Sequence, residues 1–334
     1  MEDTLRAGVI GCGMMGEAHA RLYDEMTKTE LVAVMDPDES RARSLGATHG
    51  CAVFSDLDGF AGVDLDIVSL CVDDRYHVEP AVRMAELGRH LLIEKPLALT
   101  VEDCDTITAA AEAAGITMMV GHCVRFDPRY HGAYQAICRG ELGDISHAYA
   151  RRTNTWATAR RIGGRVELPF YLGVHDIDIL RWLVASEVRR VSAVCSREVL
   201  PSLGLKAADA YYALLSFENG AVGCVDISWS TPDAFGWKLD AACHVMGTRG
   251  AVRIDFSDEG FVRCDEDKAV SGGVTYGFEV AGRLRGALHA EVAHFVDCVL
   301  YGRAPMVSSQ DARRAVEIAQ AMVRSAEEGI AVDL

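Results

Sequence analysis

The fold of the first part of the chain is predicted most directly by one segment, Leu5-Arg6-Ala7-Gly8-Val9-Ile10-Gly11-Cys12-Gly13-Met14-Met15-Gly16. An apolar run, which predicts a strand, leads directly into the pattern Gly-x-Gly-x-x-Gly, and a predicted helix follows. Asp36 ends the next predicted strand, 20 residues after Gly16. Glycine patterns alone are common, but a strand before the pattern, a helix after it and an acidic residue at this distance together predict a dinucleotide-binding unit.

Each position of the pattern has a physical purpose. Gly11 permits the tight turn, Gly13 lets the backbone approach a pyrophosphate, and Gly16 lets the helix pack closely on the strand. The predicted helix begins at Met15, and the backbone amides of Met14 and Met15 at its start, with the helix dipole, favour phosphate binding. We therefore expect these five residues to contact the cofactor.

The acidic residue predicts which dinucleotide binds. Asp36 is expected to accept hydrogen bonds from the adenosine ribose hydroxyls, and its charge would repel a 2′-phosphate. NAD is therefore favoured over NADP. Arg41, on the following predicted helix, would soften this exclusion, so NADP stays an alternative.

The pattern of elements changes near residue 122. Before it, apolar strands alternate with amphipathic helices, which is typical of a parallel sheet covered on both faces. After it, strands follow one another without helices between them, which predicts an antiparallel sheet. We expect an α/β Rossmann domain at residues 1–122 and an α+β domain with a large, mostly antiparallel sheet at residues 123–334. The C-terminal helix is a candidate for packing back on the first domain.

Composition excludes several classes of partner. The 334 residues carry a formal net charge of −16, which disfavours nucleic acid and anionic membranes. No apolar run approaches the roughly 20 residues of a membrane span. The 11 cysteines form no Cys-x-x-Cys pair, so we expect free thiols in a reducing cytoplasm and no structural zinc or other metal.

Several further segments occur in a characteristic order: Glu94-Lys95-Pro96, Gly121-His122, Arg125-Phe126-Asp127-Pro128, Gly173-Val174-His175-Asp176-Ile177-Asp178, and Glu291-Val292-Ala293-His294-Phe295. With the glycine loop, they make the whole chain resemble the Gfo/Idh/MocA family of oxidoreductases. The resemblance implies an NAD(P)-dependent dehydrogenase that oxidises a secondary hydroxyl of a sugar, cyclitol or sugar derivative. It also implies a homodimer or homotetramer packed through the sheet of the second domain.

The resemblance also implies catalytic residues. His175 corresponds to the family's base, and a histidine titrates near neutral pH, so it can take the hydroxyl proton. Lys95 is expected to bind the substrate oxygen and stabilise its developing charge. Glu94 is expected to orient Lys95 or contact the nicotinamide ribose, and His77 to lie near the cofactor. Without the resemblance, a histidine buried in the core would be the simpler interpretation of His175.

The chain departs from the family at one position. Inositol dehydrogenase-like members carry an aspartate four residues before the histidine, where this chain has Tyr171. A tyrosine brings no charge at neutral pH. Asp178, three residues after His175, is a candidate replacement on the same helical face, and Tyr171 is expected to contact the substrate.

Five arginines fall within fifteen residues, which is unusual in an acidic chain: Arg151, Arg152, Arg160, Arg161 and Arg165. They predict either an anion site, for a uronate or a nucleotide diphosphate, or a set of salt bridges. Asn154 and Trp156 lie in the same predicted loop, where a tryptophan face would suit a sugar ring. With Arg152 and Arg125, they are candidate substrate-binding residues.

Two other functions stay open. The arginines keep a nucleotide-diphospho-sugar dehydrogenase as an alternative substrate class. A non-catalytic dinucleotide-binding sensor is the alternative from another class, although such relatives tend to lose the lysine or the histidine that this chain keeps.

Overall fold

The protein is described here from a computed structural model that covers residues 4–162, 164–235, 239–256, 262–264, 269–271 and 277–334. Contacts divide the chain into two compact units. The first comprises Met1–Cys123 and Tyr276–Arg313, and the second comprises Val124–Thr275 and Arg314–Leu334. This division differs from a single boundary after residue 122, because residues 276–313 group with the first unit while the end of the chain groups with the second.

The first unit contains a parallel sheet of six strands in the order β3-β2-β1-β4-β5-β6. The strands are β1 (Leu5–Ile10), β2 (Thr29–Met35), β3 (Ala52–Phe54), β4 (Ile67–Leu70), β5 (His90–Glu94) and β6 (Met118–Gly121). The residues of β4 and most of those in β1 and β5 are buried, as expected for strands covered on both faces. The chain reverses its direction of winding between β1 and β4, where such sheets bind ligands. The predicted Rossmann fold is confirmed.

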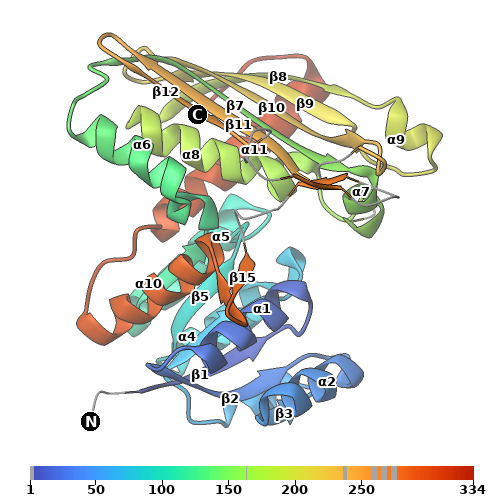
Figure 1. The fold of residues 1–334 in the computed structure, drawn as a ribbon, viewed down its shortest axis with the longest axis vertical. Coiled ribbons are helices and arrows are strands. Elements are labelled where there is room, and N and C mark those ends of the chain that lie inside the picture. The colour runs from blue at the N-terminus through green and yellow to red at the C-terminus, as the bar shows by residue number, and fades with distance from the viewer. Residues whose placement is uncertain (1–3, 163, 236–238, 257–261, 265–268, 272–276) are drawn as a thin grey trace. The chain divides into compact units, whose positions relative to one another are not determined.

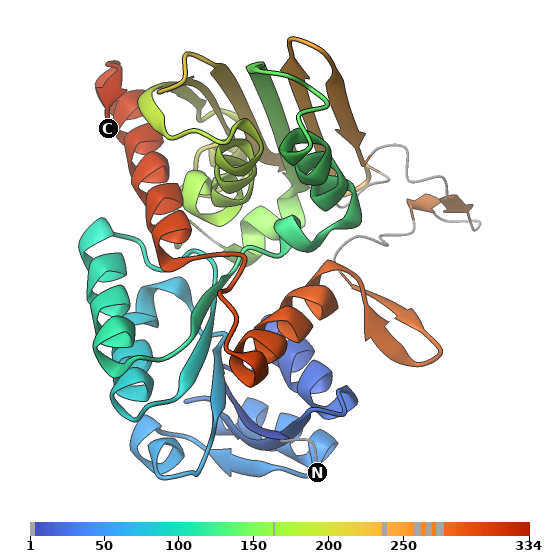
Figure 2. The same ribbon diagram turned by 90° about the vertical axis from the view of Figure 1, so that its left-hand side faces the viewer.

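Helices cover both faces of this sheet (Figure 2). They are α1 (Met14–Glu25), α2 (Glu39–His49), α3 (Leu57–Ala61), α4 (Val78–Glu86), α5 (Val101–Ala114) and α10 (Ala287–Tyr301), with a short 3₁₀ turn η1 (Asp74–Tyr76) and a hairpin of β15 (Phe278–Val280) and β16 (Arg283–Arg285). Helix α1 packs against α2 and α10, whereas α4 packs against α3 and α5. The side chain of Thr100 caps α5, and Gly115 ends it with a left-handed φ of 67°.

The second unit contains a sheet of seven strands in the order β12-β11-β7-β10-β9-β8-β17. They are β7 (Ile145–Thr155), β8 (Val188–Ser196), β9 (Ala210–Phe217), β10 (Val222–Thr231), β11 (Leu239–Gly247), β12 (Ala251–Asp255) and β17 (Val332–Asp333). Strands β7 and β10 pair in parallel, and the other neighbours are antiparallel. The mostly antiparallel sheet is therefore confirmed. Strands β13 (Val262–Cys264) and β14 (Ala269–Ser271) pair separately.

One face of this larger sheet is covered by helices (Figure 1). Helix α8 (Val174–Val184) packs on β7 and β10, and α6 (Pro128–Cys138) packs on α8 and β12. The remaining helical elements are η2 (Cys123–Phe126), α7 (Trp156–Ile162), the π-helical turn η3 (Pro169–Gly173), α9 (Val199–Ser202) and α11 (Ser309–Glu328). Apolar side chains of β8 to β11 are exposed: Val194, Tyr212, Leu214, Val222 and Met246. Among the described residues, no helix combines the length and apolarity needed to cross a membrane.

Candidate active site

The glycine loop has the geometry that dinucleotide binding requires. Gly11 has a φ of +96°, and a Cβ atom there would lie 2.6 Å from the backbone of Cys71. A Cβ atom on Gly16 would lie 1.7 Å from the carbonyl oxygen of Gly11, so only glycine allows α1 to approach the loop. Gly13, the N-cap residue of α1, faces open space and has no side chain to occupy the first amides of the helix. These residues therefore fit a pyrophosphate at the N-terminus of α1.

Asp36 lies directly after β2, beside the glycine loop. Its Oδ2 atom accepts from the backbone amide of Cys12 at 2.8 Å, and its Oδ1 atom accepts from the amide of Asp38 at 2.9 Å. These bonds hold the carboxylate at the carboxyl end of the strand, where a ribose is expected. Arg41 is exposed and pairs with Asp38 at 3.3 Å, so its positive charge lies at the carboxylate of Asp38 and not at that of Asp36. The arrangement favours NAD.

His77 is enclosed between two loops of the first unit. Its ring is completely buried, with Nδ1 3.0 Å from the carbonyl oxygen of Leu97 and Nε2 3.3 Å from that of Val72. Burial lowers its pKa, although the carbonyl contacts oppose the shift. The ring thus links the loops after β4 and β5, and its expected proximity to the cofactor stays a prediction.

Glu94 and Lys95 follow each other at the end of β5. Glu94 is buried and accepts from Nε2 of His19, on α1, at 3.2 Å. Lys95 is half-buried. Sequence reasoning missed His19, although its position three residues after Gly16 places both on one face of α1. It also gave no role to Glu291, the buried acid in the apolar helix α10.

In the second unit, His175 is the second residue of α8 and is half-buried. Two acidic neighbours on this helix are buried and bind arginines through both carboxylate oxygens. Asp176 binds Arg152 at 2.8 and 3.0 Å. Asp178 binds Arg125 at 2.8 and 2.5 Å. Asp178 is thus paired with Arg125, and its role as the replacement for the family aspartate beside His175 stays a prediction.

The arginine cluster is not one site. Arg151 and Arg152 are consecutive in β7, so their side chains lie on opposite faces of the sheet. Arg152 is buried on the face covered by α8, while Arg151 binds Asp240 of β11 at 2.8 Å. The guanidinium of Arg152 is bound by Asp176, and a contact of Arg152 with the substrate stays a prediction.

The other three arginines lie in different surroundings. Arg160 pairs with Asp233 at 2.6 Å, and Arg161 donates to the hydroxyl of Tyr171 at 2.6 Å. Arg165 is exposed. Of the two interpretations, the geometry favours structural ion pairs over an anion site.

The residues expected around the substrate do not share one loop. Asn154 lies in β7, and Trp156 begins α7 and donates from Nε1 to the carbonyl oxygen of Ser230 at 2.8 Å. Tyr171 lies in the π-helical turn that precedes α8. The position four residues before His175 is therefore not one α-helical turn away, and π-turns of this kind often occur at functional sites.

Comparisons with known proteins agree with this geometry. Residues 5–122 match a family described as an oxidoreductase family with an NAD-binding Rossmann fold, and residues 135–334 match its C-terminal alpha/beta domain. Inositol 2-dehydrogenase 1 of Saccharopolyspora erythraea is 31% identical over 344 residues, covering 99% of this chain and 96% of that protein.

Two further relatives extend the comparison. The scyllo-inositol 2-dehydrogenase (NAD(+)) of Bacillus subtilis is 28% identical and covers 100% of this chain and 97% of that protein. The crystal structure of GenD2 from gentamicin A biosynthesis, in complex with NAD, matches with a TM-score of 0.84 and 26% identity, covering 99% and 97% of the two chains.

Proposed function

Because the chain belongs to the Gfo/Idh/MocA family of oxidoreductases, we propose that its substrate is an inositol and that it oxidises one secondary ring hydroxyl. The protein is an NAD-dependent oxidoreductase that acts on a CH–OH group. The observation that carries the choice of inositol is the similarity of nearly the whole chain to an inositol 2-dehydrogenase. The pairing of Arg151, Arg152 and Arg160 with acidic side chains weakens the main argument for a nucleotide sugar.

His175 is the proposed base. Oxidation removes a hydride from the ring carbon and a proton from its hydroxyl, and NAD supplies the hydride acceptor. The imidazole of His175 takes the hydroxyl proton. The ion pair between Asp176 and Arg152 fixes the start of α8 on β7 and so restricts where this imidazole lies.

Lys95 is the proposed binding group for the substrate oxygen. Its ammonium stabilises the negative charge that develops on that oxygen as the proton leaves. Glu94, its neighbour, is held by His19 and fixes the end of β5 from which the lysine extends. Tyr171 and Asn154 are proposed to contact the ring hydroxyls.

We also propose that the protein forms a homo-oligomer through the open face of its larger sheet. Val194 is 66% exposed and Leu214 is 63% exposed. Val194 of β8 pairs with Tyr212 of β9, and Leu214 lies two residues further along β9, on the same face as Tyr212. Contiguous exposed apolar side chains mark interaction surfaces. Leu214→Glu is expected to lower the sedimenting mass, whereas Leu87→Glu, at an exposed leucine of the first unit, is not.

A cytoplasmic location is proposed as well. Cys12, Cys104 and Cys243 are buried free thiols, which suits a reducing compartment.

The activity test follows NADH formation with myo- and scyllo-inositol, free aldoses, uronates and nucleotide sugars. We expect turnover with an inositol, a fall of about 10²–10⁴-fold in His175→Ala, and unchanged NAD binding in that variant. Turnover with a nucleotide sugar alone would contradict the proposed substrate. NAD binding without turnover on any member of the panel would favour the sensor.

A further inference from the structure

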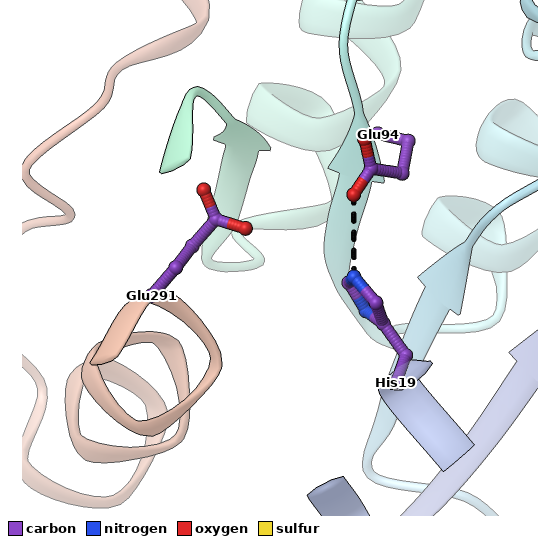
Figure 3. A group of neighbouring side chains, drawn as sticks. All are labelled: His19, Glu94 and Glu291. Atoms are coloured by element: carbon purple, nitrogen blue, oxygen red, sulfur yellow. Dashed lines mark hydrogen bonds and ion pairs between the residues drawn. The ribbon is translucent and has the colours of Figure 1, made fainter. Parts of the chain in front are cut away.

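Three buried polar side chains meet inside the first unit (Figure 3). They are His19 of α1, Glu94 at the end of β5 and Glu291 of α10. His19 and Glu291 are completely buried, and Glu94 is 8% exposed. Their ligand-type atoms all lie within 4.8 Å of one another. Two carboxyl groups are thus enclosed together, and burying them both as anions would be costly.

A chain of hydrogen bonds leads to Glu94. The hydroxyl of Tyr23 lies 2.7 Å from Oγ of Ser69, which lies 2.9 Å from Nδ1 of His19. Nε2 of His19 then lies 3.2 Å from Oε1 of Glu94. One direction satisfies every group: Tyr23 donates to Ser69, Ser69 to His19, and His19 to a carboxylate. Burial would raise the pKa of Glu94, but the hydrogen bond from His19, together with the positive charge of the neighbouring Lys95, outweighs it and holds that pKa low.

Glu291 has a different environment. Within the part of the chain that the structure describes, neither of its carboxyl oxygens has a hydrogen-bond partner. Gly121 of β6 leaves the space between the two acids: a Cβ atom there would lie 3.3 Å from Oε1 of Glu94 and 3.5 Å from Oε1 of Glu291. Burial, and then the charge of Glu94, raise the pKa of Glu291 well above its usual range.

We propose that Glu291 binds one proton at neutral pH and shares it with the carboxylate of Glu94, directly or through one water molecule. Two carboxyl groups this close in a dry interior cannot both ionise. Glu94 already has a donor in His19, so the proton belongs on Glu291, whose O–H then donates toward Glu94. Glu291 is in this sense a positioning residue, and its effect on Lys95, the next residue after Glu94, rests on the function proposed above.

Among the described residues, none donates a hydrogen bond to the carboxyl group of Glu291, and the one charge that shifts its pKa is that of Glu94. Helix α10 packs on α1, β5 and β16. Arg285 of β16 lies near Glu25, at 3.8 Å. Burial raises the pKa of Tyr23 and of Cys71, so both stay neutral. Around Glu291, the titratable groups of the cluster and its surroundings are His19, Tyr23, Cys71, Glu94, the neighbouring Lys95 and His77, which interacts with Glu94.

A metal ion is the competing occupant. One imidazole and two carboxylates are suitable ligands for zinc or manganese. However, Nε2 of His19 would have to give up its bond to Glu94 and offer a lone pair instead. The existing hydrogen-bond chain satisfies His19 without an ion, which favours the proton.

The first test is independent of turnover. At pH 7, wild-type protein is expected to show an infrared C=O stretching band of a protonated carboxyl, and Glu291→Gln is expected to lose it. Because the pKa of Glu291 is raised in the folded state, the wild-type folding constant should fall by up to tenfold per pH unit as pH rises above about 4.3. Glu291→Gln should lack this component, and Glu86→Gln, at an exposed glutamate of α4, should retain it.

The second test addresses positioning. Glutamine keeps a donor toward Glu94, whereas leucine has a similar size and no donor. With the wild-type enzyme as reference, kcat/KM should stay within about threefold in Glu291→Gln and fall about tenfold in Glu291→Leu. The proposal would be overturned if wild type and Glu291→Gln showed the same C=O stretching band and the same pH dependence of folding. It would also be overturned if the wild-type protein bound one equivalent of zinc or manganese and Glu291→Gln did not. A wild-type protein without dehydrogenase activity would contradict the proposed function, yet leave the infrared and folding results to decide the proton site.

Discussion

Arg152 and Asp176 form a buried, two-pronged ion pair that joins β7 to the first turn of α8, immediately beside His175. Both side chains are only 1% exposed. Removing one member leaves the other charge buried without its partner. The pair therefore determines how firmly the helix that carries the proposed base is held on the sheet.

Breaking this pair should destabilise the protein strongly. Arg152→Met or Asp176→Leu alone is expected to lower the free energy of unfolding by about 3–5 kcal/mol, while the double variant should recover most of the loss. Urea denaturation of the three variants measures this. Asp233→Asn, which breaks the exposed pair with Arg160, should cost less than about 1 kcal/mol. Equal losses in the single and double variants would contradict the account of a coupled pair.

Asp36 should control the choice of dinucleotide. Asp36→Asn removes the charge that repels a 2′-phosphate and weakens the bonds to the ribose hydroxyls. We expect the KM for NAD to rise about tenfold or more, and the preference for NAD over NADP to shrink. Asp38→Asn keeps the cap of α2 and should change the preference little. Steady-state kinetics with both dinucleotides decides, and an unchanged preference in Asp36→Asn would refute the role.

Alanine substitutions at two glycines of the loop should have different effects, one on NAD binding and one on stability. A Cβ atom on Gly13 meets nothing, so Gly13→Ala should keep its melting temperature and lose affinity for NAD, because the methyl group enters the pyrophosphate space. Gly16→Ala clashes with the backbone of Gly11 and should lower the melting temperature itself. Calorimetry with and without NAD separates the two effects. Normal NAD affinity in Gly13→Ala would place the phosphates elsewhere.

Asp209 should make the second unit sensitive to acid. Burial would raise its pKa, but the backbone amides of Leu200, Val199 and Glu198, at 2.7, 2.8 and 2.6 Å, lower it. A lowered pKa in the folded state gives stability that is present above the unfolded value of about 3.9 and is lost as pH falls through the folded value. Asp209→Asn should cost about 2 kcal/mol at pH 7, and progressively less below about pH 4. Unfolding free energies at pH 7, 4 and 3 provide the check, and a cost independent of pH would show that the charge is unimportant.

Long helices and strands could be predicted from the sequence, because apolar residues recur at the period of the element and so identify its buried face. Helix α5 begins and ends where its cap residues, Thr100 and Gly115, indicated. Short elements such as β3 and α3 carry too few residues for a periodic signal and were missed. The sequence predicts a loop where α7 lies, because the arginines of this short helix interrupt its apolar face.

The candidate site was predictable only where local chemistry defines it. The glycine loop and Asp36 act through backbone geometry a few residues away, and their placement agrees with the sequence. The partners of Arg152 and Arg125 lie far along the chain, at Asp176 and Asp178, so spacing alone could not identify them. The meeting of Glu94 with Glu291 likewise depends on α10 joining the first unit, which no local pattern indicates.

The central claim is direct hydride transfer from an inositol ring carbon to NAD, and deuterium labelling tests it most directly. The wild-type enzyme would be incubated with NAD and an inositol deuterated at its ring carbons, and the reduced dinucleotide analysed by mass spectrometry. The account predicts one deuterium in each NADH formed. Reduced dinucleotide without deuterium, or no reduction while NAD is bound, would contradict it.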